Sequence, residues 1–255
     1  MGKILALMNE KGGVGKSALT FSCAWNMMEI GHRVLIVDMD GQMANITYLA
    51  GVATDSHTKT MEDILLRDED ATECVVRVNS LGTGCLDMIP ATVQMAALSS
   101  TAKISKMKKV LRSLAQKYDY VFLDVNPSPD WRHALTLSVL DGVCIVMLPD
   151  ILSLEANKGI FDSIEEVQES TNQELKVLGF VLNEFDNRTR LSRAVIEKAQ
   201  QMAEYCNTNL FETKIRKAVT FSESAATHEG VTAYAPKSAI AEDIRNLTRE
   251  LVQNL

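Results

Sequence analysis

A glycine-rich run near the start of the sequence carries the residue types that phosphate binding requires. Three glycines are followed by a lysine and a serine, at Gly12, Gly13, Gly15, Lys16 and Ser17. The run lies between an apolar stretch at 4–8 and a helix-like stretch at 18–30. A glycine turn between strand and helix points successive backbone N–H groups into one concavity, which suits phosphate. Lys16 can reach the terminal phosphates, and the Ser17 hydroxyl can ligate the Mg²⁺ that bridges them.

Two aspartates stand at the ends of apolar, β-branched stretches that are typical of buried strands. Asp38 follows the stretch 33–37, and Asp124 ends the stretch 120–124. In doubly wound sheets ligands bind at the carboxyl ends of the strands, so acids placed there are candidates for holding Mg²⁺ or water. Asp124 can complete the Mg²⁺ coordination that Ser17 and phosphate oxygens begin.

A further apolar stretch, 177–182, ends at Asn183. A side-chain amide at a strand end can accept and donate hydrogen bonds together, which suits it to read the edge of an adenine. An Asx turn, in which the side chain bonds nearby backbone, explains the same residue equally well.

Strands alternate with helices along the sequence. Besides the stretches above, we expect strands at 86–90 and 143–149, helices at 102–117 and 191–205, and a closing amphipathic helix at 238–255. A phosphate loop after the first strand and acids at later strand ends indicate an α/β fold, a doubly wound, mostly parallel β-sheet with helices on both faces. Because no linker, repeat or low-complexity tract divides the chain, we expect a single domain over residues 1–255.

The composition is that of a globular protein. The 255 residues include 46% hydrophobic residues and carry a net charge of −7, which leaves room for a local basic patch only. The five cysteines are scattered without a C-x-x-C pair, so we expect neither disulfides nor zinc. No apolar run approaches the ~20 residues that span a bilayer, and no signal peptide is recognisable, so we expect a cytoplasmic protein without a membrane partner.

The loop departs from a standard P-loop at two positions. Glu10 stands where the standard spacing has a glycine, and Lys11 adds a second lysine. The run 11–17 resembles the deviant Walker A loop of the ParA/MinD/Soj family of ATPases. The resemblance implies ATP and Mg²⁺ as cofactors, and a Lys11 that reaches across a dimer interface to the partner subunit's nucleotide. The nucleotide-binding residues that it implies are Lys11, Gly12, Gly13, Val14, Gly15, Lys16, Ser17, Ala18 and Asn183.

Two further segments resemble the switch regions of that family. Asp40 matches the switch I residue that positions the attacking water, with Gly41 in place of the usual proline. The segment 124–128 is similar to switch II, with Asn126 in place of one proline. Basal hydrolysis is expected to be slow, because an NTPase that awaits a partner's charge can lack a factor of about 10³ to 10⁵. The implied catalytic residues are Lys11, Lys16 and Asp40, and the implied Mg²⁺ ligands are Ser17 and Asp124.

A stretch rich in lysine and arginine is a candidate DNA-binding site. Between Asp186 and Lys217 there are seven basic and four acidic residues, in a chain whose total charge is −7. Arg188 and Lys217 match positions where the family carries DNA-contacting arginines, and Arg216 stands in place of a family proline. The resemblance implies nonspecific DNA binding by an ATP-dependent homodimer. An ordinary solvated basic face is the alternative explanation.

The resemblance as a whole implies a ParA/Soj-like ATPase for plasmid or chromosome partition. In that scheme the MgATP-bound dimer associates with the nucleoid, and hydrolysis stimulated by a ParB-like centromere-binding partner releases it. One alternative is a MinD-like or other cargo-positioning ATPase at a membrane or protein surface, although the balanced charges of 238–255 count against a membrane anchor. The other is a metabolic P-loop enzyme, such as a carboxylating ligase or an iron–sulfur reductase. No cysteine follows switch II closely enough to support an iron–sulfur cluster.

Overall fold

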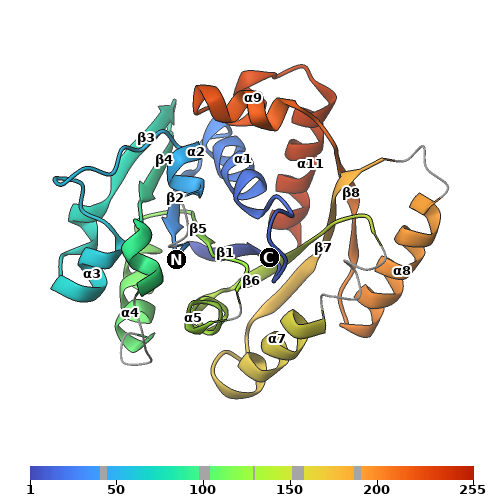
Figure 1. Cartoon of the computed structure of the whole chain (residues 1–255), viewed down its shortest axis with the longest axis horizontal. Helices are drawn as coiled ribbons and strands as arrows, with labels where there is room; N and C mark the ends of the chain where they lie inside the picture. The colour runs from blue at the N-terminus through green and yellow to red at the C-terminus, as the bar shows by residue number, and fades with distance from the viewer. Residues whose placement is uncertain (41–44, 98–103, 129, 151–157, 187–190) are drawn as a thin grey trace.

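Eight strands form a single sheet in the order β3-β4-β2-β5-β1-β6-β7-β8 (Figure 1). The structure is a computed structural model that describes residues 1–40, 45–97, 104–128, 130–150, 158–186 and 191–255. Neighbouring strands are parallel except β3 and β4, which are antiparallel. The predicted doubly wound, mostly parallel sheet is therefore confirmed.

The central strands are buried on both faces. The strands are β1 Lys3–Met8, β2 Arg33–Asp38, β3 Val76–Leu81, β4 Gly84–Ile89, β5 Tyr120–Asp124, β6 Gly142–Met147, β7 Lys176–Phe185 and β8 Leu210–Arg216. In β1, Ile4, Ala6 and Met8 join the hydrophobic core on one side of the sheet, and Leu5 and Leu7 join the core on the other side. Because successive side chains point to opposite faces, a strand covered on both faces needs a continuous apolar run.

Helices cover both faces of the sheet. They are α1 Lys16–Glu29, α2 Asn45–Leu49, α3 Met61–Arg67, α4 Ile104–Leu114, α5 Trp131–Val139, α7 Lys158–Ser170, α8 Leu191–Tyr205, α9 Thr220–Thr227, α10 Val231–Tyr234 and α11 Ala239–Gln253. Figure 1 shows α1, α2, α9 and α11 on one side and α3, α4, α5, α7 and α8 on the other. The predicted closing helix is α11. Its apolar stripe, Ile240, Ile244, Leu247 and Leu251, is buried in the core beside α1.

The sequence predicts neither β3 nor β8. Both lie at the edges of the sheet, where one side of a strand has no neighbour. Residues of β3 are half-buried or exposed, and β8 mixes buried with exposed residues, so neither strand produces an apolar run. The helix expected at 102–117 is α4, which is described from Ile104 and ends at Leu114, and turns follow at 115–117.

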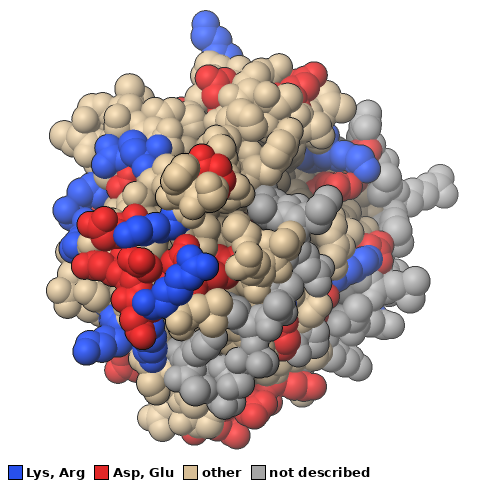
Figure 2. Space-filling view, turned by 60° about the vertical axis from the view of Figure 1, so that its left-hand side comes forward, with Lys and Arg blue, Asp and Glu red and all other residues tan. Residues whose placement is uncertain are grey.

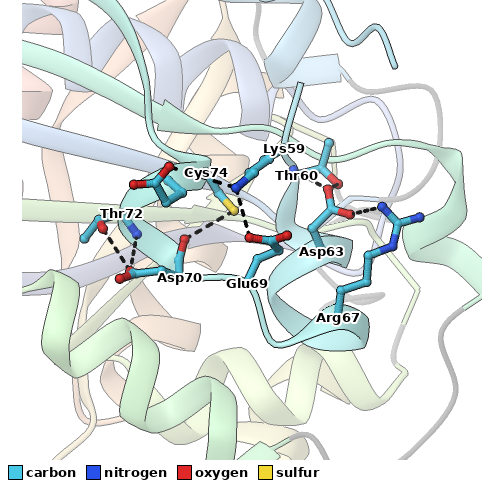
Figure 3. A network of polar contacts seen from close by, with 9 residues as sticks. Lys59, Thr60, Asp63, Arg67, Glu69, Asp70, Thr72 and Cys74 are labelled. Atoms are coloured by element: carbon cyan, nitrogen blue, oxygen red, sulfur yellow. Dashed lines mark hydrogen bonds and ion pairs between the residues drawn. The ribbon is translucent and has the colours of Figure 1, made fainter. Parts of the chain in front are cut away.

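The charged segment at 54–79 forms a local network of polar contacts around α3 (Figure 3). Thr60 and Asp63 form a capping box at the start of α3, and Arg67 pairs with Asp63 over 2.6 Å. Lys59 Nζ lies 3.0 Å from Glu69 Oε2. Figure 2 likewise shows acidic and basic side chains intermixed on this face. These contacts indicate that the charged side chains of this segment stabilise the segment itself.

Candidate nucleotide-binding site

The loop between β1 and α1 is fixed at the carboxyl edge of the sheet. Asn9 Nδ2 donates to the carbonyl of Val146 in β6 over 2.6 Å, and Asn9 Oδ1 accepts from the N–H of Lys11 over 2.6 Å. Gly13 and Gly15 have φ values of 74° and 91°, where a residue with a side chain is strained. The loop and the first turn of α1 therefore present backbone N–H groups to a phosphate.

Asn183 packs directly against this loop. Its Nδ2 donates to the carbonyl of Val14 over 2.8 Å, although 169 residues separate the two in sequence. A Cβ on Gly15 would collide with that amide nitrogen, so glycine is required there for space as well as for φ. Asn183 Oδ1 is buried and has no hydrogen-bond partner among the described residues. The contact is with loop backbone, and the reading of adenine by Asn183 stays a prediction.

Ser17 and Asp124 meet where a Mg²⁺ ligand pair is predicted. Ser17 Oγ donates to Asp124 Oδ2 over 2.7 Å. Asp124 Oδ1 is buried without a hydrogen-bond partner in the part of the chain that the structure describes. Burial raises the pKa of Asp124 to about 7, against the lowering effect of the Ser17 hydrogen bond. A hydroxyl and a carboxylate with an unsatisfied oxygen are hard oxygen ligands, so the residues fit Mg²⁺.

Lys16 lies inside the site, between the loop and the acids. Lys16 is only 6% exposed, and its Nζ donates a hydrogen bond to the carbonyl of Lys11 over 3.2 Å. Burial lowers the pKa of the Lys16 ammonium, whereas Asp124 and Asp40 raise it. The ammonium is thus held within the field of both carboxylates, where it can meet the terminal phosphates of a nucleotide.

The segment that resembles switch I begins at Asp38, which lies beside Asp124 in the register of β2 and β5. Asp38 is fully buried; burial raises its pKa to about 8, and Asp124 adds to the rise. Its Oδ1 accepts from the N–H of Asp40 over 2.8 Å, and its Oδ2 accepts from Thr47 Oγ1 over 2.6 Å. Asp40 is 4% exposed, at the same edge of the sheet as the loop. Gly41 lies outside the described residues.

The other predicted loop residues differ in exposure. Gly12 and Gly13 are exposed, Val14 is buried, and Ala18 is half-buried in the first turn of α1. Lys11 has a half-exposed side chain, and its Nζ lies 3.9 Å from Asp150 Oδ2. Gly12 approaches switch II, because a Cβ on it would lie 3.7 Å from Pro127 Cγ.

The structure places one of the two predicted DNA-binding residues. Lys217 follows β8, its side chain is 77% exposed, and its Nζ lies 3.0 Å from Glu184 Oε2 at the end of β7. Arg188 lies outside the described residues. The neighbouring Arg216 makes three hydrogen bonds to Asp243 of α11, with Nε to Oδ2 at 2.6 Å. Arg216 therefore ties β8 to α11.

Several residues of the site were not singled out from the sequence. Asn9 contacts the loop, and Thr47 contacts Asp38, which the sequence does predict. An asparagine directly after a strand is the one local signal of the two. Trp131, the first residue of α5, is partly buried and packs against the hydrophobic core. His133, two residues on, is 2% exposed, and its Nε2 bonds the carbonyl of Asn126 in switch II at 2.8 Å.

Known proteins resemble this chain over its whole length. A family model described as an AAA domain matches residues 2–177. The chain is 30% identical to the sporulation initiation inhibitor protein Soj of Bacillus subtilis, with 100% of both chains covered. It is 28% identical to the chromosome partitioning protein ParA of Myxococcus xanthus, over 99% of this chain and 89% of that one.

Solved structures show the same fold. Cobyrinic acid a,c-diamide synthase from Mycobacterium smegmatis, with bound ATP analog and magnesium, has a TM-score of 0.82 at 25% identity, covering 99% of this chain and 95% of that one. The septum site-determining protein MinD of Pyrococcus horikoshii, complexed with Mg-ADP, has a TM-score of 0.80 at 22% identity, covering 98% and 96%. Nucleotide and magnesium, the cofactors predicted for the loop, are thus confirmed among structures of this family. The loop geometry, the fold and the full-length relatives together establish that the chain belongs to the ParA/MinD family of P-loop ATPases.

Proposed function

We propose that the chain is a ParA/Soj-like partition ATPase, in which MgATP joins two subunits and hydrolysis separates them. The supporting observation is the contrast between the two lysines of the loop. Lys16 is 6% exposed beside the carboxylates, whereas the Lys11 side chain is 46% exposed at the rim of the loop. A buried lysine serves phosphates bound to its own loop. Lys11 Nζ lies 3.9 Å from Oδ2 of Asp150, and both side chains are half-exposed. An exposed ion pair of this kind has a small energy, so a nucleotide phosphate on the partner subunit can replace the carboxylate.

The residues of the site divide the chemistry between them. Mg²⁺, when bound, neutralises phosphate charge, and Ser17 and Asp124 hold it. Lys16 binds the terminal phosphates, and the backbone of 12–18 surrounds them. Asp40 orients the attacking water, and Lys11 adds positive charge from the opposite subunit. Basal hydrolysis is slow, because the final stimulating contact comes from a ParB-like partner.

The dimer binds DNA without sequence preference. Lys217 is exposed at the end of β8, and its exposed ion pair with Glu184 is worth little, so phosphate can replace the carboxylate. Arg188 is the second contact. One subunit offers few phosphate contacts, whereas a dimer doubles them, and the salt dependence of binding rises with each contact. The chain acts as one domain in the cytoplasm and joins the nucleoid when ATP is bound. The names of two full-length relatives, Soj and a chromosome partitioning ParA, support this role.

Two features bear on the alternative of a membrane-associated, MinD-like protein. Within the described ranges, no helix is long and apolar enough to cross a membrane. The apolar stripe of α11 is already buried in the core beside α1, so this helix cannot lay it on a lipid surface without unpacking. The likeness to the diamide synthase favours a metabolic ATP-using enzyme as the second candidate, and such an enzyme would turn over ATP without regard to DNA.

DNA retention tests the proposal. Filter binding of plasmid DNA with ATP and with ADP, over a series of salt concentrations, is expected to show retention with ATP only and a steep loss with salt. Arg188→Glu with Lys217→Glu should abolish retention. Lys109→Glu with Lys117→Glu is a matched control, because it changes the net charge equally at two exposed positions elsewhere. Equal retention by the two double variants would contradict the DNA site.

A further inference from the structure

The short helix α2 is anchored at its start to the acids of switch I. Thr47 Oγ1 donates to Asp38 Oδ2 over 2.6 Å, and the other oxygen of the same carboxylate accepts the N–H of Asp40 over 2.8 Å. Ile46 is fully buried in the core beside α1. Because Asp38 is shared, a displacement of α2 is transmitted to the backbone that carries Asp40.

The far end of α2 is held by a residue 180 positions away in the sequence. His228 Nδ1 lies 2.9 Å from the carbonyl oxygen of Tyr48, which also accepts the N–H of Gly51 at 2.9 Å. The rings of His228 and Tyr48 meet edge to face, with centroids 5.5 Å apart and planes at 76°. A Cβ on Gly51 would lie 2.8 Å from His228 Cγ, so the glycine makes room for the imidazole. His228 thus caps a carbonyl at the end of a helix that is only five residues long.

His228 is itself fixed by the segment that carries it. It ends α9 in the left-handed conformation, with φ 57° and ψ 34°, and its N–H bonds the carbonyl of Ala225. Two residues later, Gly230 packs against Trp25 of α1, and a Cβ on Gly230 would collide with the indole. The same segment follows β8, and α9 begins three residues after Lys217. Figure 1 shows α9 above α1, beside α2.

We propose that His228 is a positioning residue for ATP hydrolysis. It holds α2 in place, α2 holds Asp38 through Thr47, and Asp38 holds the backbone of Asp40. The contact also connects the segment after Lys217 to the hydrolytic acid, so a partner that moves α9 changes turnover. This inference rests on the proposed role of Asp40 as the residue that orients water.

The hydrogen bond between His228 and the carbonyl of Tyr48 determines which variants test its role. A backbone carbonyl only accepts, so Nδ1 carries the hydrogen. Asparagine places an amide N–H close to the position of Nδ1 and tolerates the left-handed conformation, so His228→Asn should keep the contact. His228→Gly removes the side chain without backbone strain. Asn207→Gly is a matched control, because Asn207 also has a positive φ, 51°, and follows α8 elsewhere in the fold.

Steady-state ATPase kinetics and amide hydrogen exchange test the inference together. For His228→Gly, kcat is expected to fall about five- to tenfold, roughly the factor that one net hydrogen bond represents, with KM for MgATP almost unchanged. Amides at 45–52 should exchange faster. His228→Asn should restore both quantities, and Asn207→Gly should alter neither. A kcat for His228→Gly equal to that of the wild type would overturn the positioning role.

The outcomes separate this inference from the proposed function. If the wild-type chain hydrolyses no ATP, the ATPase proposal fails, and hydrogen exchange still decides whether His228 holds α2. If the amide exchange rates at 45–52 are unchanged in His228→Gly, the claim that His228 holds α2 is contradicted. A rise in KM with kcat unchanged would also overturn it, because that pattern indicates lost nucleotide binding rather than misplacement of the hydrolytic acid.

Discussion

Ser17 and Asp124 lie 107 residues apart in sequence and 2.7 Å apart between Oγ and Oδ2. This contact joins the first turn of α1 to the end of β5. The other oxygen of Asp124 is buried without a partner among the described residues, and a cation is the natural group to satisfy it.

The pair predicts how magnesium contributes to nucleotide affinity. Asp124→Asn keeps the shape of the side chain but removes its charge, so Mg²⁺-dependent affinity for ATP should fall about 10- to 100-fold, the range for a charged contact. Calorimetric titration with ATP in Mg²⁺ and in EDTA checks this. In EDTA the variant and the wild type should bind alike. A variant that keeps the full Mg²⁺ effect would remove Asp124 from the metal site.

Gly15 and Gly13 provide a matched pair in the loop. Both have positive φ, but only at Gly15 would a Cβ collide with Asn183, and nothing lies within 4 Å of a Cβ on Gly13. Gly15→Ala should therefore weaken ATP binding more than Gly13→Ala, which carries backbone strain alone. Adding Asn183→Ala to Gly15→Ala should recover part of the loss. Calorimetry on the wild type, Gly15→Ala, Asn183→Ala and the double variant completes the cycle. Equal losses for the two glycines would show that Asn183 does not limit the loop.

Asp40 should separate binding from turnover. Asp40→Ala removes a group that acts in the transition state, so kcat should fall about 100-fold or more while ATP affinity is kept. Phosphate release measured in single turnover, beside equilibrium binding of a slowly hydrolysed analogue, resolves the two quantities. Undiminished hydrolysis by this variant would assign the water-positioning role to another residue.

The contact between Arg216 and Asp243 is expected to contribute to the free energy of unfolding. Asp243 is 7% exposed and receives three hydrogen bonds from Arg216, whose own side chain is 52% exposed. Asp243→Ala should lower the free energy of unfolding by about 1–2 kcal/mol, since the freed guanidinium can still reach water. Glu242→Ala on the same helix removes only an exposed pair with Arg245 and should change it by less than about 0.5 kcal/mol. Urea unfolding of the two variants measures both values, and equal midpoints would contradict the account of Arg216.

The parts of the fold that the sequence predicts are those with a strong local signal. Burial on both faces forces continuous apolar runs on β1, β2, β5 and β6, and the phosphate loop has a fixed spacing. The edge strands β3 and β8 have no such run, because only part of each is buried.

The contacts that complete the site have no local signal at all. Asn183 against Val14 and His228 against Tyr48 join residues 169 and 180 positions apart. Such pairs follow from how the strands and helices are arranged in space. Local sequence patterns do not predict which residues that arrangement brings into contact. Arg216 illustrates the same limit. By sequence it is a departure from a family proline, and in the fold it is an ion pair with α11.

The role of Lys11 is the central claim, because it makes the nucleotide a link between two subunits. Sedimentation velocity with ADP, and with a slowly hydrolysed ATP analogue, measures it most directly for the wild type and Lys11→Ala. We predict a monomer with ADP and a dimer with the analogue for the wild type, and a monomer in both states for Lys11→Ala, which still binds the nucleotide. A dimer of Lys11→Ala that forms with the analogue as readily as that of the wild type would contradict the account.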